Sequence, residues 1–367
     1  MSTIADLCCW LDAFAPVRLA AEWDNVGLLF GERSASCQRI MTCLTVTPES
    51  AAEALERRAS LIVTHHPILF RPVKRLTTDS AEGAMLWRLA QAGVAVYSPH
   101  TAFDNAREGI NARLAERLRL GDVVPLRAHA EASQCRVVVF VPLPDLERVA
   151  SALFAAGAGQ IGNYRECSFR LEGTGTFFGL DASSPRVGQK GRREEVSEYR
   201  LEVVCPLAQV EAVVAAMRRV HPYEEPAFDV YSLLGRQSSE GEGRLGLLPE
   251  PIRLSQFASR VKESIGSNLA QYSGEPNRPV RRVALACGAA GEFLPDAIRR
   301  HADVFLTGEA RFHDCLAAQA SGIALVLAGH YATERFAVEE LAQKIKEEFK
   351  SLEVWASARE RDPLTSA

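Results

Sequence analysis

The sequence predicts an α/β protein in which one discontinuous α/β domain carries an inserted α+β domain. Three observations support this fold class. Short apolar segments alternate with segments of helical periodicity in the first third of the chain and again in the last third. The middle of the chain instead shows the order strand, helix, strand, strand, helix, strand. At 367 residues, the chain is also long enough for two domains.

The first third of the chain is expected to alternate helices and strands. Apolar residues at helical spacing predict a helix over residues 2–15. The next expected elements are a strand at 39–46, a helix at 50–58, a buried strand at 60–64, a helix at 80–92, a strand at 94–98 and a helix at 106–118. Strands separated by helices in this rhythm indicate a sheet with both faces covered.

The middle of the chain changes character. Strands are expected at 136–142, 168–178, 199–205 and 227–233, with helices at 145–156 and 207–220. This order is that of a ferredoxin-like module. The stretch 237–246, rich in Gly, Ser and Glu, predicts the exit linker. The domains are therefore expected at 1–128 (α/β domain, first part), 129–236 (inserted domain) and 237–367 (α/β domain, second part).

The last third returns to alternation. The expected elements are a helix at 254–265, a strand at 283–287, a helix at 293–301, a strand at 304–307, a helix at 309–319, a buried strand at 323–327 and a helix at 332–349. The tail 357–367 is predicted to be frayed.

Composition limits the functional classes. Apolar residues make up 47% and charged residues 24%, as in ordinary globular proteins. With 42 basic and 46 acidic residues interspersed, nucleic-acid binding has no electrostatic support. Nine scattered cysteines, an odd number without a C-x-x-C pair, indicate a reducing compartment, and no basic leader or membrane-length apolar stretch is present. A cytoplasmic protein without membrane contact is expected.

Three buried strands are each followed by histidine. His65 and His66 follow the strand at 60–64. His100, with Asp104 four residues later, follows the strand at 94–98, and His330, with Glu334 four residues later, follows the strand at 323–327. In open α/β sheets, ligands bind beyond the carboxyl ends of the strands. These segments therefore predict one shared site.

The residue types predict metal binding. His330 and Glu334 share one face of a helix start, whereas Asp104 could instead cap a helix. His65 and His66 point in opposite directions if their backbone is extended, so two ions bridged by a carboxylate would use both imidazoles better than one ion. Mixed imidazole and carboxylate ligation suits zinc, iron(II), manganese or cobalt. Each histidine alone could be a satisfied polar residue, and Glu334 could merely favour a helix N-terminus, but their coincidence favours a metal site.

Five segments resemble one known family. Glu22–Gly31 (EWDNVGLLFG), Thr64–Pro67 (THHP), His100-Thr-x-x-Asp104, Gly308-Glu309-x-x-x-His313-Asp314 and Gly329-His330-x-x-x-Glu334 are similar to the GTP cyclohydrolase I type 2 homologues, or Nif-three-like dinuclear-metal proteins. The resemblance implies two divalent metal ions per subunit, zinc, iron or manganese, bound by His65, His66, Asp104, His330 and Glu334. It also implies that His100 and His313 line the same cavity, and that the protein is a homohexamer. Thr45 and Glu309 depart from the family, which usually has Asp at both positions.

The inserted segment resembles the insert of longer family members, whose fold is similar to that of the PII and CutA proteins. The motifs that carry this resemblance are Gly157–Tyr164, Cys167–Phe169 and His221–Pro226. Turn geometry alone would also explain their glycines and prolines, and a ligand site is the alternative.

Two functions are consistent with the sequence. The first is a metal-dependent hydrolase that acts on a nucleotide or related small molecule, with His100 or His313 moving protons. The second is a metal-binding regulatory or chaperone-like protein whose insert senses a small ligand. Deletion of residues 130–235 separates the two, since a regulatory insert would be dispensable for turnover. A purely structural role of the metals is a third possibility.

Overall fold

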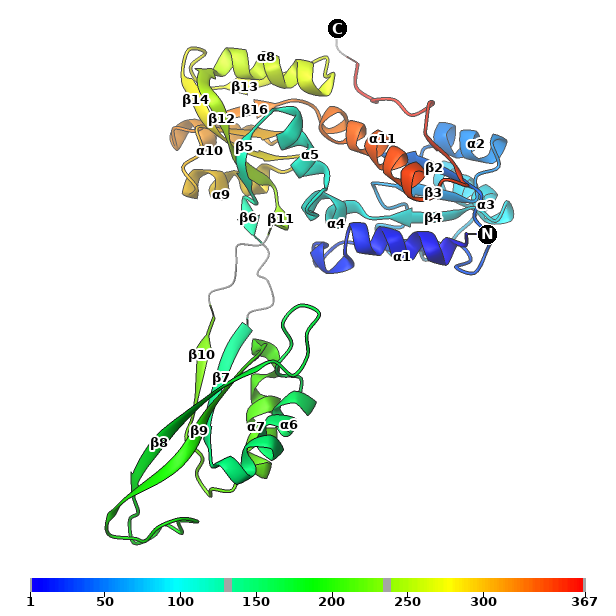
Figure 1. Cartoon of the computed structure of the whole chain (residues 1–367). Helices are drawn as coiled ribbons and strands as arrows, with labels where there is room; N and C mark the ends of the chain where they lie inside the picture. Colours follow the sequence, from blue (N-terminus) through cyan, green and yellow to red (C-terminus); the bar gives the residue numbers. More distant parts are fainter. Residues whose placement is uncertain (1, 129–133, 234–238, 366–367) are drawn as a thin grey trace. The chain divides into compact units, whose positions relative to one another are not determined.

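The computed structural model describes residues 2–128, 134–233 and 239–365. The chain forms two compact units, one made of Met1–His129 with Ser239–Ala367 and the other of Ala130–Ser238 (Figure 1). The expected domain boundaries at 128/129 and 236/237 adjoin or fall within 129–133 and 234–238, which lie outside the described residues. No helix in the described parts of the chain has the length and apolar character needed to span a membrane.

The first unit is built around two large sheets. Its N-terminal part forms α1 (Ile4–Phe14), η1 (Val17–Leu19), β1 (Gly27–Phe30), β2 (Arg39–Cys43), α2 (Pro48–Glu56), β3 (Leu61–Thr64), α3 (Ala81–Gln91), β4 (Ala95–Ser98), α4 (His100–Asn105), α5 (Ile110–Arg117), β5 (Gly121–Val124) and β6 (Arg127–Ala128). Helix starts follow the local sequence: the Thr3 and Thr47 side chains accept hydrogen bonds from backbone N–H groups of α1 and α2.

The C-terminal part of this unit completes both sheets. It forms β11 (Gly241–Glu242), β12 (Arg244–Arg253), α8 (Leu254–Ile265), β13 (Gln271–Ser273), β14 (Pro279–Ala286), η4 (Gly291–Phe293), α9 (Leu294–Arg299), β15 (Val304–Thr307), α10 (Phe312–Ala320), β16 (Ala324–Leu327), α11 (His330–Glu348) and β17 (Glu353–Ala356). One sheet has the order β1-β4-β3-β2-β17 and the other β13-β16-β15-β14-β12-β5, while β11 and β6 pair separately.

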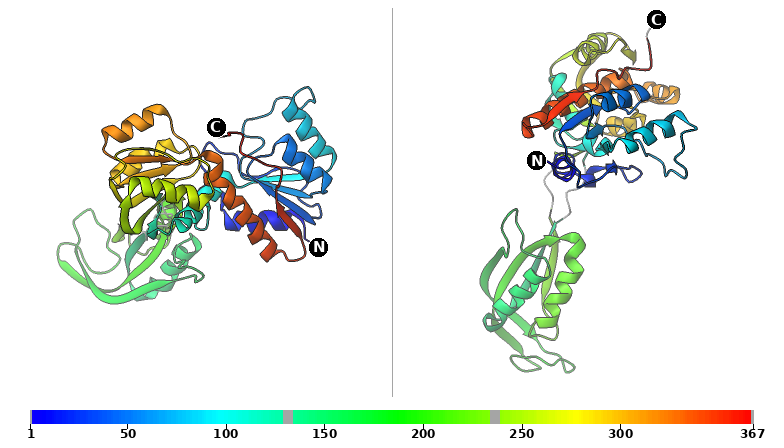
Figure 2. Two further views of the ribbon diagram at one scale, coloured as in Figure 1. Left: turned by 90° about the horizontal axis from the view of Figure 1, so that it is seen from above. Right: turned by 90° about the vertical axis from the view of Figure 1, so that its right-hand side faces the viewer.

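Each large sheet has a parallel centre. β2, β3 and β4 run parallel in one sheet, and β14, β15 and β16 run parallel in the other. Helix α11 lies between the two sheets (Figures 1 and 2). A single buried cluster includes Leu7 on α1, Tyr97 in the first sheet, Val283 in the second, and Phe336 on α11. This shared core holds the two parallel centres in one unit.

The second unit has a different topology. It contains β7 (Gln134–Val141), η2 (Leu143–Asp145), α6 (Leu146–Ala155), β8 (Ser168–Phe178), β9 (Arg193–Pro206), η3 (Leu207–Gln209), α7 (Val210–Val220) and β10 (Phe228–Ser232). The four strands form one antiparallel sheet in the order β10-β7-β9-β8. Alternate residues of β7, including Val137 and Val139, pack with Val149 of α6 and Met217 of α7 in a separate core. A mixed α/β fold with several sheets is thus confirmed.

The structure corrects the expected helix at 106–118. Residues 100–105 already form α4, and Ala106 then adopts an extended conformation before α5 begins after Gly109. Asp104 therefore lies inside α4, and the interpretation of Asp104 as a helix N-cap is wrong. The cap position of α5 belongs to Gly109.

Two expected irregular segments are ordered in part. Residues 244–246 of the expected linker begin β12, where the buried Arg244 guanidinium donates to the carbonyl oxygens of Gly241 and Ala106. The tail was expected to fray from residue 357, but Ser357 and Glu360 are buried. Their polar side chains find partners in α2 and next to β2, which a reading of hydrophobic periodicity alone does not detect.

Candidate metal centre

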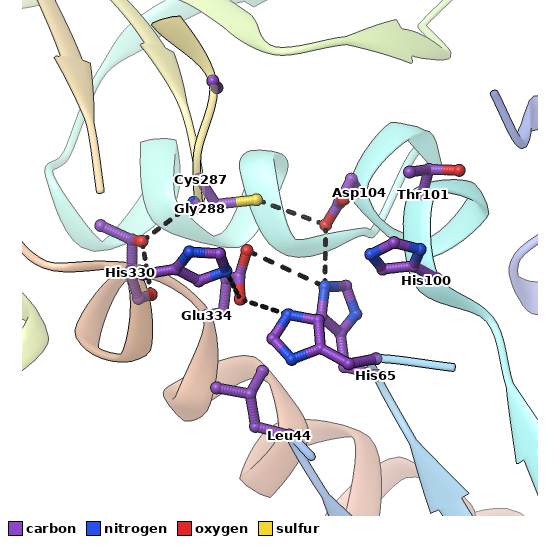
Figure 3. A network of polar contacts seen from close by, with 12 residues as sticks. Leu44, His65, His100, Thr101, Asp104, Cys287, Gly288, His330 and Glu334 are labelled. Carbon is purple, nitrogen blue, oxygen red and sulfur yellow. Dashed lines mark hydrogen bonds and ion pairs between the residues drawn. The ribbon is translucent and has the colours of Figure 1, made fainter. Parts of the chain in front are cut away.

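The three histidine segments converge because both parallel strand sets end at the same place. β3 ends at Thr64, directly before His65 and His66, and β4 ends two residues before His100. In the other sheet, β16 is followed by His330, the first residue of α11. Figure 3 shows the imidazoles of these segments around the Glu334 side chain.

Glu334 lies at the centre of the cluster. Its Oε2 atom is 3.2 Å from Nε2 of His66 and 3.1 Å from Nε2 of His330, one helical turn earlier. Its Oε1 atom is 3.9 Å from Nε2 of His65, which is also 3.6 Å from Oδ1 of Asp104 (Figure 3). All five residues predicted as ligands from the resemblance are therefore brought together.

The expected divergence of His65 and His66 is wrong. Their ring centroids are 5.0 Å apart, and both imidazoles face Glu334. β3 ends at Thr64, so the two histidines lie in a bend and do not follow the alternation of an extended strand. The need for two ions consequently does not follow from this pair.

Two groups of side chains have the spacing of a metal site. His65, His66 and His100 form one group, and His66, His330 and Glu334 form the other. Within each group, the possible ligand atoms lie within 4.8 Å of one another. The two groups share His66, so they are neighbouring parts of one cluster.

Polar partners hold two of the imidazoles on the side away from Glu334. Nδ1 of His66 is 2.7 Å from Oγ1 of Thr45, and Nδ1 of His330 is 2.9 Å from Oε1 of Glu309. In both rings, Nε2 is left facing Glu334. Partners of this kind orient histidines that bind metals and set the tautomer. Thr45 and Glu309 are the two positions that depart from the family pattern, and both still supply an oxygen.

His100 is held by Asp24. Its Nδ1 atom is 2.7 Å from Oδ1 of Asp24, whose other oxygen accepts hydrogen bonds from the backbone N–H and the hydroxyl of Thr101. His100 has a positive φ of 27°, a backbone conformation that residues other than glycine rarely adopt. We infer that the hydrogen bonds accepted by Asp24 hold this strained backbone in place.

Residues from distant parts of the chain hold the backbone segments next to the cluster in place. Glu360 in the tail accepts hydrogen bonds from the backbone N–H groups of Leu44 and Thr45, at 2.8 and 2.5 Å. Gly308 lies so close to the backbone of Gly288 and to His330 that a Cβ atom would be 2.6 Å from the Gly288 oxygen. Any larger residue at 308 would therefore displace the segment that leads into α11.

The polar atoms of the cluster fit a metal ion. Both ring nitrogens of His65 are buried and have no hydrogen-bond partner among the described residues. Buried polar atoms without partners are rare and costly in folded proteins. An ion bound to His65 would satisfy one of these nitrogens, and the combination of imidazole nitrogens and carboxylate oxygens suits a divalent transition metal.

The titratable groups of the cluster have pKa values that are shifted in different directions. Burial lowers the pKa of His65, so its imidazole is neutral. Burial, followed by the charge of Glu334, raises the pKa of Asp104 to about 7. The hydrogen bond to Glu334 raises the pKa of His330 to about 9. Burial alone would raise the pKa of Glu334. Hydrogen bonds from His330 and His66 outweigh burial, so the pKa of Glu334 is lowered.

These shifts predict how metal affinity depends on pH. Without metal, His330 carries a proton up to pH about 9 and Asp104 up to pH about 7. A metal ion must displace these protons, so about one proton should be released near pH 8 and more than one below pH 6. Apparent affinity should therefore fall as the pH falls, and more steeply below pH 7. Zinc titrations of the metal-free protein in weak buffer with a pH indicator measure this release, and a release near zero at both pH values would contradict it.

His313 lies on α10, which carries none of the other predicted site residues. It is exposed on α10, where its ring contacts that of Phe312 at a centroid distance of 5.8 Å. Among the described residues, the ion pairs and ring contacts that join the cluster do not include it.

Several residues of the site were not singled out as site residues from the sequence. They are Asp24, Thr45, Asn111, Cys287, Glu309, Thr333 and Glu360. Cys287 donates to Oδ1 of Asp104 at 3.3 Å, and its backbone N–H donates to Asn111. Asp24 lies within the segment 22–31, so motif resemblance pointed to the right stretch without giving the role of the carboxylate. Nothing in the local sequence around Glu360 indicates its contact with Leu44, 316 residues away.

The fold and the cluster define an α/β protein with a possible histidine and glutamate metal site. A model of the Duf34/NIF3 (NGG1p interacting factor 3) family matches residues 2–363. The chain belongs to this family, and the resemblance found in its motifs is confirmed.

Curated relatives and solved structures agree with this assignment. The chain is 36% identical over 357 residues to the "GTP cyclohydrolase 1 type 2 homolog" of Halalkalibacterium halodurans, with 96% of each chain covered. It is also 36% identical over 334 residues to the homolog of Bacillus subtilis, covering 91% of this chain and 89% of that one. A Bacillus cereus protein related to NIF3 is similar in structure, with a TM-score of 0.72, 34% identity and coverage of 100% and 99%.

Proposed function

We propose that this protein is a metal-dependent hydrolase with a dinuclear centre that acts on a nucleotide or a related small molecule. The observation that carries the proposal is the pair of buried, unpartnered ring nitrogens of His65 beside the Glu334 carboxylate, at the meeting point of two parallel strand sets. The names of the relatives, homologs of GTP cyclohydrolase 1 type 2, support a nucleotide substrate. Elemental analysis of the freshly purified protein and a screen of nucleotides and phosphoesters test it.

Two sets of close contacts around Glu334 support two ions. His65 with Asp104 would hold one ion, and His330 with His66 would hold the other, while the two oxygens of Glu334 face both sets. Zinc, iron or manganese suits this donor set. Two divalent ions held there would supply a water-derived nucleophile near neutral pH and would polarise the substrate. A content near one ion per chain would contradict the dinuclear part of the proposal.

The residues of the chain would orient the substrate and move protons. Asp24 fixes Nδ1 of His100, which leaves Nε2 of His100 for proton exchange with a substrate. His65 and His100 are in ring contact at 5.2 Å, so this exchange would occur beside the cluster. His313 remains a second predicted proton carrier.

An aromatic pair next to His100 supports a substrate with a planar ring. The Trp23 and Phe70 rings are 5.8 Å apart, and Trp23 is 6.1 Å from the His100 ring. Their side chains are 60% and 46% exposed, although aromatic residues are usually buried. The Asn25 side chain donates to the Leu69 carbonyl oxygen at 2.7 Å and so joins the two loops that carry these rings.

Trp23→Ala should therefore weaken the binding of GTP about tenfold, since stacking of one base on an aromatic side chain contributes ~1–3 kcal/mol. Binding of inorganic tripolyphosphate, which has no ring, and the metal content should stay unchanged. Trp87→Ala is the matched control, because Trp87 is also exposed, at 45%, and lies on α3. Equal losses in the two variants, or a loss of tripolyphosphate binding with Trp23→Ala, would refute the role of this pair.

For the second unit we propose a ferredoxin-like fold of the PII and CutA type. Its support is the strand order β10-β7-β9-β8 with α6 and α7 between successive strands.

The family resemblance further suggests a homohexamer, which sedimentation velocity would test. A cytoplasmic location agrees with nine free cysteines. If deletion of residues 130–235 leaves turnover intact, the insert is regulatory; if no substrate is turned over at all, the metal-binding regulatory or chaperone-like alternative gains.

A further inference from the structure

The second unit contains a cavity of about 870 Å³. One wall is the part of the β8–β9 hairpin around Thr174–Phe178 and Val196–Arg200. The connection between these strands and the segment Tyr223–Ala227 supply the other walls. A volume of this size lies in the range of roughly 300–1,000 Å³ found for pockets that bind small molecules.

The His-Pro-Tyr-Glu-Glu-Pro motif builds one of these walls. His221 is buried, its Nε2 lies 3.0 Å from the carbonyl oxygen of Phe140, and its Nδ1 accepts from the backbone N–H of Tyr223 at 3.1 Å. Both ring nitrogens of a neutral His221 are thereby satisfied, so this histidine has a structural role. The backbone N–H of Ser184 donates to Glu224 at 2.8 Å and fastens the β8–β9 connection to the motif.

Two polar groups meet inside the cavity. The hydroxyl of Tyr223 is buried and has no hydrogen bond of normal geometry among the described residues. Burial, and then the carboxylate of Glu198 beside it, raises the pKa of Tyr223. Gly175 on the neighbouring strand provides the room for Glu198, because a Cβ atom at this position would overlap the carboxylate. A side chain at 175 would thus displace the acidic group from its place.

The charges of the lining are predominantly acidic. Its two guanidinium groups are engaged by carboxylates outside the lining: Arg200 contacts Glu202 at 2.7 Å, and Arg186 lies 3.9 Å from Asp145. The lining carboxylates are those of Glu172, Glu198, Glu224 and Glu225. Within the described chain, Glu198 forms no ion pair with Lys, Arg or His. The cavity therefore contains a carboxylate, that of Glu198, with which no Lys, Arg or His of the described chain forms an ion pair.

The apolar part of the lining is aromatic and aliphatic. Phe140 and Phe177 lie in its walls together with Leu180 and Val187. Aromatic faces attract cations as well as apolar groups, with a strength that increases when water is excluded. An apolar body and a positive charge are thus the two features that this cavity would recognise together.

We propose that the cavity of the second unit binds an organic cation, whose aromatic or aliphatic body lies against Phe140 and whose amine donates hydrogen bonds to Glu198 and the Tyr223 hydroxyl. This site consists only of residues of the second unit and is separate from the metal cluster. The sequence left a ligand site as one explanation of the motif 221–226, and the proposal names an organic cation as that ligand. The proposal does not depend on whether the first unit is a hydrolase.

Isothermal titration calorimetry on the full-length protein tests the proposal with two probes of similar shape and opposite charge. Tryptamine is the cationic probe and indole-3-propionate the anionic one. Tryptamine should bind at least about tenfold more tightly, because a hydrogen-bonded ion pair that is partly shielded from water exceeds the roughly 1.4 kcal/mol that a tenfold ratio requires. Equal affinity for the two probes, or no binding of tryptamine at millimolar concentration, would overturn the proposal.

Three variants locate the site. Glu198→Gln should lower the affinity for tryptamine about tenfold and remove most of the preference over indole-3-propionate, and Tyr223→Phe should lower it a fewfold. Glu195→Gln is the matched control, since Glu195 is exposed on the same strand and, three residues away, faces the opposite side. Sedimentation velocity accompanies each titration. If Glu198→Gln changes the oligomeric state while tryptamine affinity is unaffected, the cavity belongs to a contact between copies of the chain and the proposal is wrong.

Discussion

Glu334→Gln should purify with less than about a tenth of the wild-type metal content and should lose any hydrolytic turnover with it. The carboxylate of Glu334 lies within 3.9 Å of Nε2 atoms of three histidines, His65, His66 and His330. Glutamine keeps the shape of the side chain but supplies a neutral amide in place of an anion that faces both groups of possible ligands. Elemental analysis of the purified variant and a turnover assay measure the two losses.

Glu347→Gln is the control for this prediction. Glu347 lies on the same helix, α11, is exposed, and accepts a hydrogen bond from Gln343. This variant should keep both metal and turnover. If Glu334→Gln retained the wild-type metal content, the cluster around Glu334 would not be the metal site.

Glu53→Ala should lower the free energy of unfolding of the first unit by about 3 kcal/mol or more. The Glu53 carboxylate is buried and accepts hydrogen bonds from the Trp355 indole at 3.1 Å and the Ser357 hydroxyl at 2.8 Å. It also accepts from the backbone N–H groups of Ala358 and Arg359. Alanine would leave these donors without a partner in a buried place, and urea unfolding monitored by fluorescence measures the cost.

Glu56→Ala separates this effect from a surface ion pair. Glu56 lies on the same helix and pairs with Arg359, but it is exposed. Exposed ion pairs contribute little to stability, so this variant should unfold at nearly the wild-type urea concentration. If Glu53→Ala lowered the free energy of unfolding as little as Glu56→Ala does, the tail from residue 357 would not be anchored by Glu53.

The fold could be predicted where hydrophobic periodicity determines it. The expected helix at 254–265 and the strands at 168–178 and 304–307 have the same bounds in the structure. The segments that were missed or misplaced depend on other forces. The short strand β17 forms because it pairs with β2, more than 300 residues earlier, and the tail after it is held by side-chain hydrogen bonds to Glu53. Such long-range polar contacts leave no period in the local sequence.

The site was predictable in its residue types and less so in its geometry. Histidines at the ends of buried strands pointed to the crevice beyond the sheets, and the structure brings His65, His100 and His330 together there. The convergence of His65 and His66 was missed because it depends on where β3 ends, a boundary that sequence patterns place only approximately. The partners behind the imidazoles, such as Asp24, were missed because they come from separate loops.

Anomalous diffraction from a crystal of the protein, recorded at the absorption edge of its bound metal, tests the central claim most directly. We expect two peaks, each about 2.0–2.2 Å from imidazole nitrogens or carboxylate oxygens of the cluster, with Glu334 in contact with both. Peaks at any other place in the chain, or a metal-loaded crystal with no peak between His65 and His330, would contradict the account.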